Sequence, residues 1–162
     1  MQPTISERHY WVGFSLIDGF GPVRFRQLES YFGSLQEAWT AAPAALEAAG
    51  IDRRALGKFR EIRPSLDLTA EMARLDKLGI SILTWNDDEY PGPLKELRKL
   101  DQAPPVLYLR GTLFERDDLA VAIVGTRNAS AYGRQVAHQL AGELAANGLT
   151  IVSGLAHGID TQ

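Results

Sequence analysis

Two nearly uncharged segments flank one strong helix pattern at the end of the chain, and this arrangement constrains the fold most. Residues 119–125 read LAVAIVG, an almost wholly apolar run typical of a parallel strand buried on both faces. Residues 130–147 have apolar and alanine side chains at helical spacing, with Ser130 as candidate N-cap and Asn147-Gly148 as stop. Residues 149–154, LTIVSG, form the next apolar run. This order predicts a right-handed βαβ unit, the start of a doubly wound sheet.

The preceding part of the chain changes character near Pro64. Residues 6–63 contain short helix patterns joined by glycine turns, without the alternating pattern of a strand. The following segment adds a helix pattern and two apolar strand candidates, ISILTW and PPVLYLRG. We therefore expect an α/β protein with an all-helical module over residues 1–64 and a doubly wound sheet of about four strands over residues 65–162. Because residues 155–162 begin a helix with nothing to pack against, we expect a piece of a longer protein.

Charge and composition limit the possible functions. The net charge of −3 differs from the basic composition of many DNA-binding proteins, so any contact with nucleic acid must come from a local patch. Residues 119–162 contain two arginines and no lysine, and both arginines, Arg127 and Arg134, lie near one loop. The absence of cysteine excludes disulfides, thiolate nucleophiles and cysteine-ligated zinc. No apolar run could span a membrane and the N-terminus lacks a signal pattern, so we expect a soluble cytoplasmic protein.

The loop over residues 124–134, VGTRNASAYGR, is a candidate phosphate site because it follows the apolar strand predicted over residues 119–125. Loops at the carboxyl end of parallel strands are where α/β proteins bind ligands. The spacing is not G-x-G-x-x-G, and an arginine stands where a dinucleotide site needs small residues. Since arginine donates bidentate hydrogen bonds to phosphate, we expect a phosphate site and not a dinucleotide site. The candidate residues are Gly125, Thr126, Arg127, Ser130, Tyr132 and Gly133.

The apolar strand predicted over residues 149–154 ends in SGLAHGID, the other half of the candidate site. Its candidate residues are Ser153, Gly154, His157, Gly158 and Asp160. The glycines permit close backbone approach, the serine and histidine offer polar donors, and the carboxylate suits the positive end of a helix. Adjacent loops of a parallel sheet are expected to hold either successive phosphates or a nucleotide. Two structural alternatives stay open: this stretch is a plain strand-to-helix turn, and Arg127 only pairs with a carboxylate such as Asp160.

Residues 17–22, IDGFGP, resemble the turn of a helix-hairpin-helix motif. Such a turn presents backbone N–H groups to a DNA phosphate, and two arginines follow it closely. The candidate secondary DNA contacts are Gly19, Gly21, Arg24 and Arg26. Two other interpretations stay open: the glycines only make a tight turn between helices, or residues 1–64 bind a protein and not DNA.

No group of side chains forms a convincing catalytic set. His9, His138 and His157 are scattered along the chain, and the acidic run NDDEY over residues 86–90 is typical of a solvated turn. We therefore expect no catalytic residue, no metal and no cofactor.

Taken together, these motifs resemble the DNA-processing protein A family, called DprA or Smf. The resemblance rests on GFGP and FGSLQEAW, then on YPGPLKEL and APPVLYLRG, and above all on VAIVGTRNASAYG and IVSGLAHGID. It implies a sterile-alpha-motif-like (SAM-like) helical domain followed by an extended Rossmann fold. It also implies binding of single-stranded DNA through phosphates at a basic pocket, homodimerisation, and loading of the RecA recombinase onto incoming DNA during natural transformation.

The chain departs from the family pattern in three respects. Thr126 stands where the family usually has serine, which keeps the hydroxyl. His157 stands where arginine is frequent, and a mostly neutral histidine makes the expected pocket less positive or pH-sensitive. The family's Rossmann domain also continues past residue 162. The leading hypothesis is a competence-related recombination mediator that protects DNA and is not an enzyme. The alternative is a nucleoside-monophosphate phosphoribohydrolase of the lysine-decarboxylase-like (LOG) family, which has a related Rossmann core.

Overall fold

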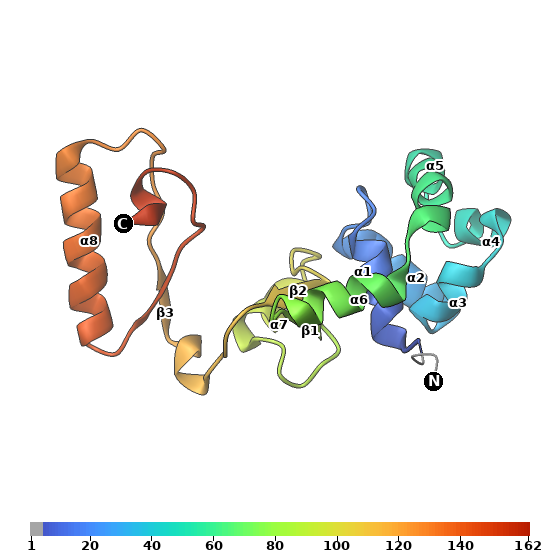
Figure 1. Cartoon of the computed structure of the whole chain (residues 1–162), viewed down its shortest axis with the longest axis horizontal. Coiled ribbons are helices and arrows are strands. Elements are labelled where there is room, and N and C mark those ends of the chain that lie inside the picture. Colours follow the sequence, from blue (N-terminus) through green and yellow to red (C-terminus); the bar gives the residue numbers. More distant parts are fainter. Residues whose placement is uncertain (1–4) are drawn as a thin grey trace. The chain divides into compact units, whose positions relative to one another are not determined.

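The computed structural model describes residues 5–162, which divide into two compact units on either side of the Thr112–Leu113 bond (Figure 1). The first, called the helical unit, contains α1 (Glu7–Ser15), α2 (Pro22–Phe32), α3 (Leu35–Thr40), α4 (Pro43–Ala48), α5 (Arg53–Ile62), the 3-10 helix η1 (Arg63–Ser65), α6 (Leu68–Lys77), β1 (Ser81–Thr84), α7 (Gly92–Arg98) and β2 (Val106–Leu109). The second, called the βαβ unit, contains η2 (Glu115–Asp118), β3 (Ala120–Ala122), α8 (Ala131–Ala146), β4 (Thr150–Val152) and η3 (Ile159–Thr161). Across the described residues, no helix combines the length and apolar character needed to cross a bilayer.

The short helices of the helical unit begin and end where the sequence supplies caps and glycines. Ser34 Oγ accepts a hydrogen bond from the Glu37 amide at 3.1 Å and so caps α3. Asp52 Oδ1 accepts from the Ala55 amide at 3.1 Å and caps α5 in the same way. Gly33 ends α2 at φ 79°, a left-handed conformation that glycine adopts without strain. The helices predicted for this part of the chain are therefore confirmed.

Aromatic side chains fill the centre of the helical unit. The Phe14 ring stacks on the Phe59 ring at a centroid distance of 5.3 Å and meets the Trp39 ring edge-on at 5.0 Å. These three residues belong to α1, α5 and α3, so the cluster joins three helices. Gly13 makes this close packing possible, because a Cβ atom there would lie 2.8 Å from the Trp39 ring.

The two strand candidates in the middle of the chain pair with each other and not with the later strands. β1 and β2 are antiparallel, with Ser81 opposite Leu109 and Thr84 opposite Val106. Ile82 and Val106 join the hydrophobic core that the helices form. The single sheet of four strands expected from the sequence is wrong, because the strands of residues 5–162 form two separate two-stranded sheets.

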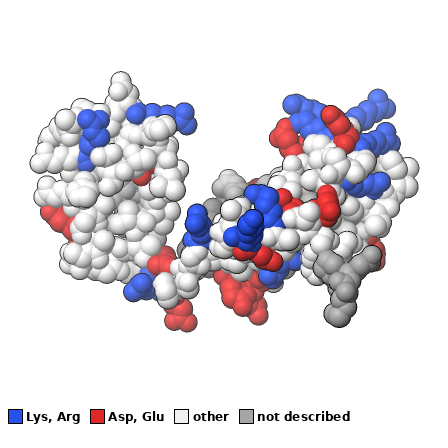
Figure 2. Space-filling view, viewed as in Figure 1, with Lys and Arg blue, Asp and Glu red and all other residues white. Residues whose placement is uncertain are grey.

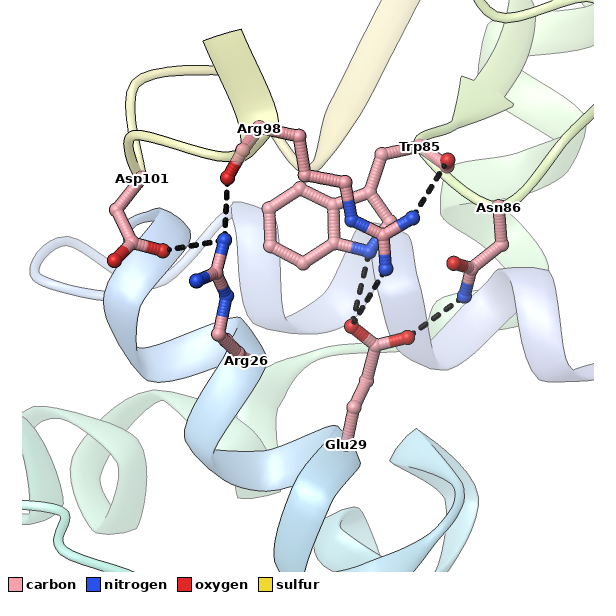
Figure 3. Close-up of polar contacts among 6 residues, drawn as sticks. All are labelled: Arg26, Glu29, Trp85, Asn86, Arg98 and Asp101. Atoms are coloured by element: carbon pink, nitrogen blue, oxygen red, sulfur yellow. Dashed lines mark hydrogen bonds and ion pairs between the residues drawn. The ribbon is translucent and has the colours of Figure 1, made fainter. Parts of the chain in front are cut away.

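Polar contacts of Glu29 connect α2 to the segment after β1 (Figure 3). Trp85 Nε1 donates to Glu29 Oε2 at 2.9 Å, and Asn86 Nδ2 donates to Glu29 Oε1 at 2.7 Å. The Arg98 guanidinium from α7 lies over the Trp85 ring, 4.7 Å from its centroid, and 3.9 Å from the Glu29 carboxylate. The helical unit thus includes β1, α7 and β2. The domain boundary at Pro64 stays a prediction.

The strand–helix–strand order predicted for the end of the chain is confirmed. β3 and β4 are parallel, with Ala120 opposite Thr150 and Ala122 opposite Val152. The connecting helix α8 begins directly after Ser130, its N-cap, whose Oγ accepts a hydrogen bond from the Gly133 amide at 3.1 Å. Local capping and the apolar runs therefore sufficed to predict this unit.

The burial expected for the first of these strands is wrong. β3 is exposed along its length. In the same apolar run, 65 % of Leu119, just before β3, and 67 % of Val124, two residues after it, are accessible. A two-stranded sheet packed on one helix leaves a large part of both strands uncovered. Where the sequence predicted the first residues of a helix, the structure has the 3-10 helix η3.

Acid is expected to destabilise the helical unit, because folding holds several carboxyl pKa values below their ordinary range. Hydrogen bonds from the Ala55 amide and then from Arg24 lower the pKa of Asp52, and Lys58 lowers the pKa of Asp18. A carboxyl with a lowered folded-state pKa stabilises folding above its ordinary pKa of 3.8, and the contribution is lost as the pH falls through the folded-state value. The urea midpoint, followed by tryptophan fluorescence, should fall between about pH 5 and about pH 3.

Asp52→Asn is the matched control for this acid dependence. Asparagine caps a helix about as well as aspartate but does not titrate. The variant should keep most of the stability of the unmodified chain at neutral pH. Its urea midpoint should fall less than that of the unmodified chain when the pH is lowered. An asparagine variant with the full decline would show that Asp52 is not among its causes.

Candidate nucleic-acid interface

Parallel pairing brings the two candidate loops to one edge of the β3–β4 sheet. The first loop, residues 124–134, follows β3, and the second loop, residues 153–160, follows β4. The Ile123 amide donates to the Val152 carbonyl at 2.9 Å, so the strands stay paired up to the point where the loops begin. The side-by-side placement expected from the sequence is present.

Local hydrogen bonds hold the first loop. Thr126 Oγ1 accepts from the Asn128 amide at 3.2 Å and closes a tight turn. Arg134, in the first turn of α8, donates to the Ala129 carbonyl. Ala129 is buried, whereas Arg127 is exposed. The loop therefore presents Arg127 from a backbone that its own polar contacts position.

The second loop folds back over the first. Ser153 Oγ lies 2.9 Å from the Ile123 carbonyl and 3.1 Å from the Asp160 carbonyl, one of which accepts its hydrogen. The Ile159 amide donates to the Thr126 carbonyl at 3.2 Å. Gly158 permits this approach, because its φ is 105° and a Cβ atom there would lie 2.1 Å from the Thr126 carbonyl oxygen. The predicted need for glycine in this turn thus has a definite cause, the backbone of the first loop.

The Asp160 side chain connects the two loops. Its Oδ1 accepts from the Gly125 amide at 3.0 Å, and its Oδ2 accepts from the Gly154 amide at 3.2 Å. One carboxylate therefore satisfies a backbone donor after each strand. The alternative in which Arg127 pairs with Asp160 is wrong, since none of the ion pairs within residues 5–162 includes Arg127.

The exposed groups of the loops are those that can meet a ligand. Arg127, Tyr132 and His157 are all exposed, and 77 % of Tyr132 is accessible. The surface of the βαβ unit is mostly uncharged (Figure 2). Its only basic residues besides histidine are Arg116, in η2 before β3, and the two loop arginines, Arg127 and Arg134. Electrostatic attraction of an anion to this edge of the sheet therefore depends on Arg127 and Arg134.

The four hairpin candidates lie in the helical unit, apart from these loops: Gly19, Gly21, Arg24 and Arg26. Gly19 has φ 99°, and its carbonyl accepts a hydrogen bond from Arg24, which also pairs with Asp52. Arg26 lies 2.8 Å from the Asp101 carboxylate (Figure 3). Both arginines thus have partners within the protein, and a DNA contact through the hairpin stays a prediction.

Sequence reasoning missed two features of the loops. A Cβ atom at Gly125 would lie 2.7 Å from Ile159 Cγ1, so a side chain of the second loop requires a glycine in the first. No local pattern signals this contact. The second missed feature is the hydrogen bond that Arg134 donates to the Ala129 carbonyl. The position of Arg134 in the first helical turn after the loop is the sequence signal that could have suggested this bond. Among residues 5–162, no group of three or more acidic or histidine side chains is arranged to hold a metal ion.

Comparison with known proteins connects this geometry to a family. The family model described as DNA recombination-mediator protein A matches residues 81–162, from β1 through both loops, which is just over half of the chain. The chain belongs to the DNA recombination-mediator protein A family. The resemblance drawn from the loop motifs is thereby confirmed, and the phosphoribohydrolase alternative finds no support.

Individual relatives agree with membership of the DNA recombination-mediator protein A family. Protein Smf of Synechocystis is 36 % identical over 162 residues, which cover 97 % of this chain and 40 % of that protein. DNA processing protein DprA of Bacillus subtilis is 40 % identical over 91 residues, covering 55 % of this chain and 29 % of that protein. A putative DNA processing protein DprA of Mycobacterium tuberculosis is 38 % identical over 114 residues, covering 64 % of this chain and 28 % of that protein. The chain thus spans less than half the length of each of these relatives.

Proposed function

We propose that this chain is the loop-bearing part of a recombination mediator that binds single-stranded DNA through its phosphates. Membership of the DNA recombination-mediator protein A family supports the class of activity. The observation that carries the proposal is an exposed arginine without an ion-pair partner, Arg127, at the edge where the two strand-following loops meet. A guanidinium in that place can donate two hydrogen bonds to one phosphate.

The exposed side chains favour contacts to the backbone and stacking over base-specific reading. Arg127 and Arg134 supply the charge, and His157 adds a polar donor. Tyr132, at the start of α8, offers an accessible ring on which a nucleotide base can stack. The remaining predicted residues shape and hold the loops: Gly125, Thr126, Ser130, Gly133, Ser153, Gly154, Gly158 and Asp160. Such an interface binds with weak sequence preference and strong dependence on salt.

Arg127→Ala is expected to weaken binding of a labelled single strand by about tenfold, because one phosphate loses its charge-assisted hydrogen bonds. The loss should be similar for strands of different sequence. The slope of log affinity against log salt concentration should also become shallower by about one. Fluorescence anisotropy titrations of the whole chain at two salt concentrations measure both quantities.

Arg116→Ala is the matched control for this experiment. It removes the same charge from the same unit, but Arg116 precedes β3 and therefore lies at the opposite end of the strand from the loops. Its affinity and salt slope should stay close to those of the unmodified chain. Equal losses in the two variants, or no loss in Arg127→Ala, would contradict a phosphate site at the loops.

The DprA and Smf resemblance extends the proposal to partners. We infer that the complete protein dimerises, binds the RecA recombinase and acts in the cytoplasm on incoming DNA, without a catalytic step or a cofactor. We also infer that the complete protein contains an extended Rossmann sheet and a SAM-like helical module. In that protein, Gly19, Gly21, Arg24 and Arg26 of the hairpin are secondary contacts to DNA. Co-sedimentation with RecA tests the partner, and release of free base from nucleoside monophosphates tests the enzymatic alternative.

A further inference from the structure

The edge of the β3–β4 sheet carries two backbone donors of the kind that bind phosphate groups in many α/β proteins. The Gly125 amide follows β3 and the Gly154 amide follows β4, and both point at one position. Backbone N–H groups after parallel strands commonly bind the phosphates of nucleotides, since glycine lets the anion approach closely. The position itself therefore suits one anionic group with two acceptor atoms.

In this protein the Asp160 carboxylate holds that position. Its two oxygens lie 3.0 Å and 3.2 Å from the two amide nitrogens, so each oxygen uses one donor. A Cβ atom at Gly154 would lie 3.0 Å from Asp160 Oδ2, which shows how closely the carboxylate approaches the backbone. A phosphate at the same place would have to displace the carboxylate or approach a like charge at contact distance.

Contacts of Ile159 and of the Asp160 backbone hold the segment that carries the carboxylate beside the two amides. Just before it, the Ile159 amide donates to the Thr126 carbonyl, and the Ile159 side chain packs where a Cβ of Gly125 would lie. The Asp160 carbonyl also lies 3.1 Å from Ser153 Oγ, which is closer, at 2.9 Å, to the Ile123 carbonyl. These contacts do not involve the carboxylate, and together they keep residue 160 near the two amides.

We propose that Asp160 is a built-in substitute for a phosphate, which bars free nucleotides and inorganic phosphates from the sheet edge. Arg127, which is exposed and outside this contact, is left as the group that meets an anion. A single arginine-bound phosphate gives weak attachment, whereas a strand offers neighbouring phosphates and bases to the same surface. Asp160 is thus a specificity residue that favours a nucleic-acid strand over a mononucleotide. This last step rests on the proposed function, but the exclusion of phosphate does not.

Titration with inorganic phosphate and pyrophosphate, followed by the amide cross-peaks of Gly125 and Gly154 in NMR spectra of the whole chain, tests the exclusion. In the unmodified chain these two peaks should stay in place, because the carboxylate holds both donors. In Asp160→Gly, which removes the carboxylate, both peaks should move together and saturate, with affinity at least about tenfold above any binding by the unmodified chain. Movement of both peaks in the unmodified chain would overturn the proposal, and so would a folded glycine variant that gains no binding.

Asp160→Asn keeps the experiment decisive if the glycine variant does not fold. Asparagine retains the shape, loses the charge, and can accept from only one of the two amides. It should gain phosphate binding to a smaller extent than the glycine variant, and a folded asparagine variant with no gain would overturn the proposal. Binding of a labelled strand is measured separately with Arg127→Ala. If no strand binds but the phosphate results hold, only the proposed function fails.

Discussion

Phe14→Ala should destabilise the helical unit by about 3–5 kcal/mol. Phe14 has no accessible surface, and its ring contacts the rings of Phe59 and Trp39 from two other helices. The rigid neighbouring rings fill the resulting cavity only in part, so the cost of the cavity adds to the lost burial. Urea unfolding followed by fluorescence reports on this unit alone, because it contains all three tryptophans, Trp11, Trp39 and Trp85.

Tyr31→Ala is the control, because it removes a ring from the same unit at an exposed position. Tyr31 is 54 % accessible, and its ring lies 4.9 Å from the neighbouring Phe32 ring, measured between centroids. Its loss should lower the stability by about 1 kcal/mol or less. Similar losses in the two variants would mean that the aromatic cluster around Phe14 is not the main source of stability.

Gly158→Ala should release the second loop from the first, with a local cost of at least about 2 kcal/mol. The φ of 105° and ψ of −122° belong to glycine, and the added Cβ would lie 2.1 Å from the Thr126 carbonyl oxygen and 2.7 Å from Arg127 Cα. Because both atoms are backbone, no side-chain rotation relieves the clash. Hydrogen exchange at the Gly125 and Ile159 amides should accelerate by about thirtyfold.

Gly142→Ala is the opposite case within the same unit. Gly142 lies in α8, and a Cβ atom there meets nothing within 4 Å. Alanine at an exposed helix position should stabilise α8 by about 1 kcal/mol and slow its amide exchange. If both glycine variants shifted exchange in the same direction, the clash assigned to Gly158 would be wrong.

The elements that could be predicted are those whose signals are local. Apolar runs, caps and glycine stops placed α8, β3 and β4, and the parallel order of strand, helix and strand followed from them. The partner of ISILTW could not be predicted, because strand pairing depends on contacts between distant segments. Its strand, β1, pairs with β2 and packs on the helices, with Ile82 in their core.

The candidate site shows the same division between local and distant signals. The sequence indicated which residues stand in the two loops, because glycine, serine and arginine have recognisable roles after a strand. It did not indicate how they are connected. The hydrogen bonds that Asp160 accepts from the Gly125 and Gly154 amides depend on the backbone path of residues 158–160. That path is restricted at Gly158 by the backbone of the first loop.

The position of Glu29 also limits how this part of the chain can be rearranged in evolution. A single carboxylate on α2 accepts bonds from Trp85 and Asn86, which lie beyond the last helix of the aromatic cluster. The Trp85 ring also packs 5.9 Å from Trp11 and 6.2 Å from Phe25. A gene fusion that took only the first helices would leave these rings uncovered and the carboxylate without its donors. We therefore expect the helices to be less stable without the segment from β1 through β2, with which they form one compact unit.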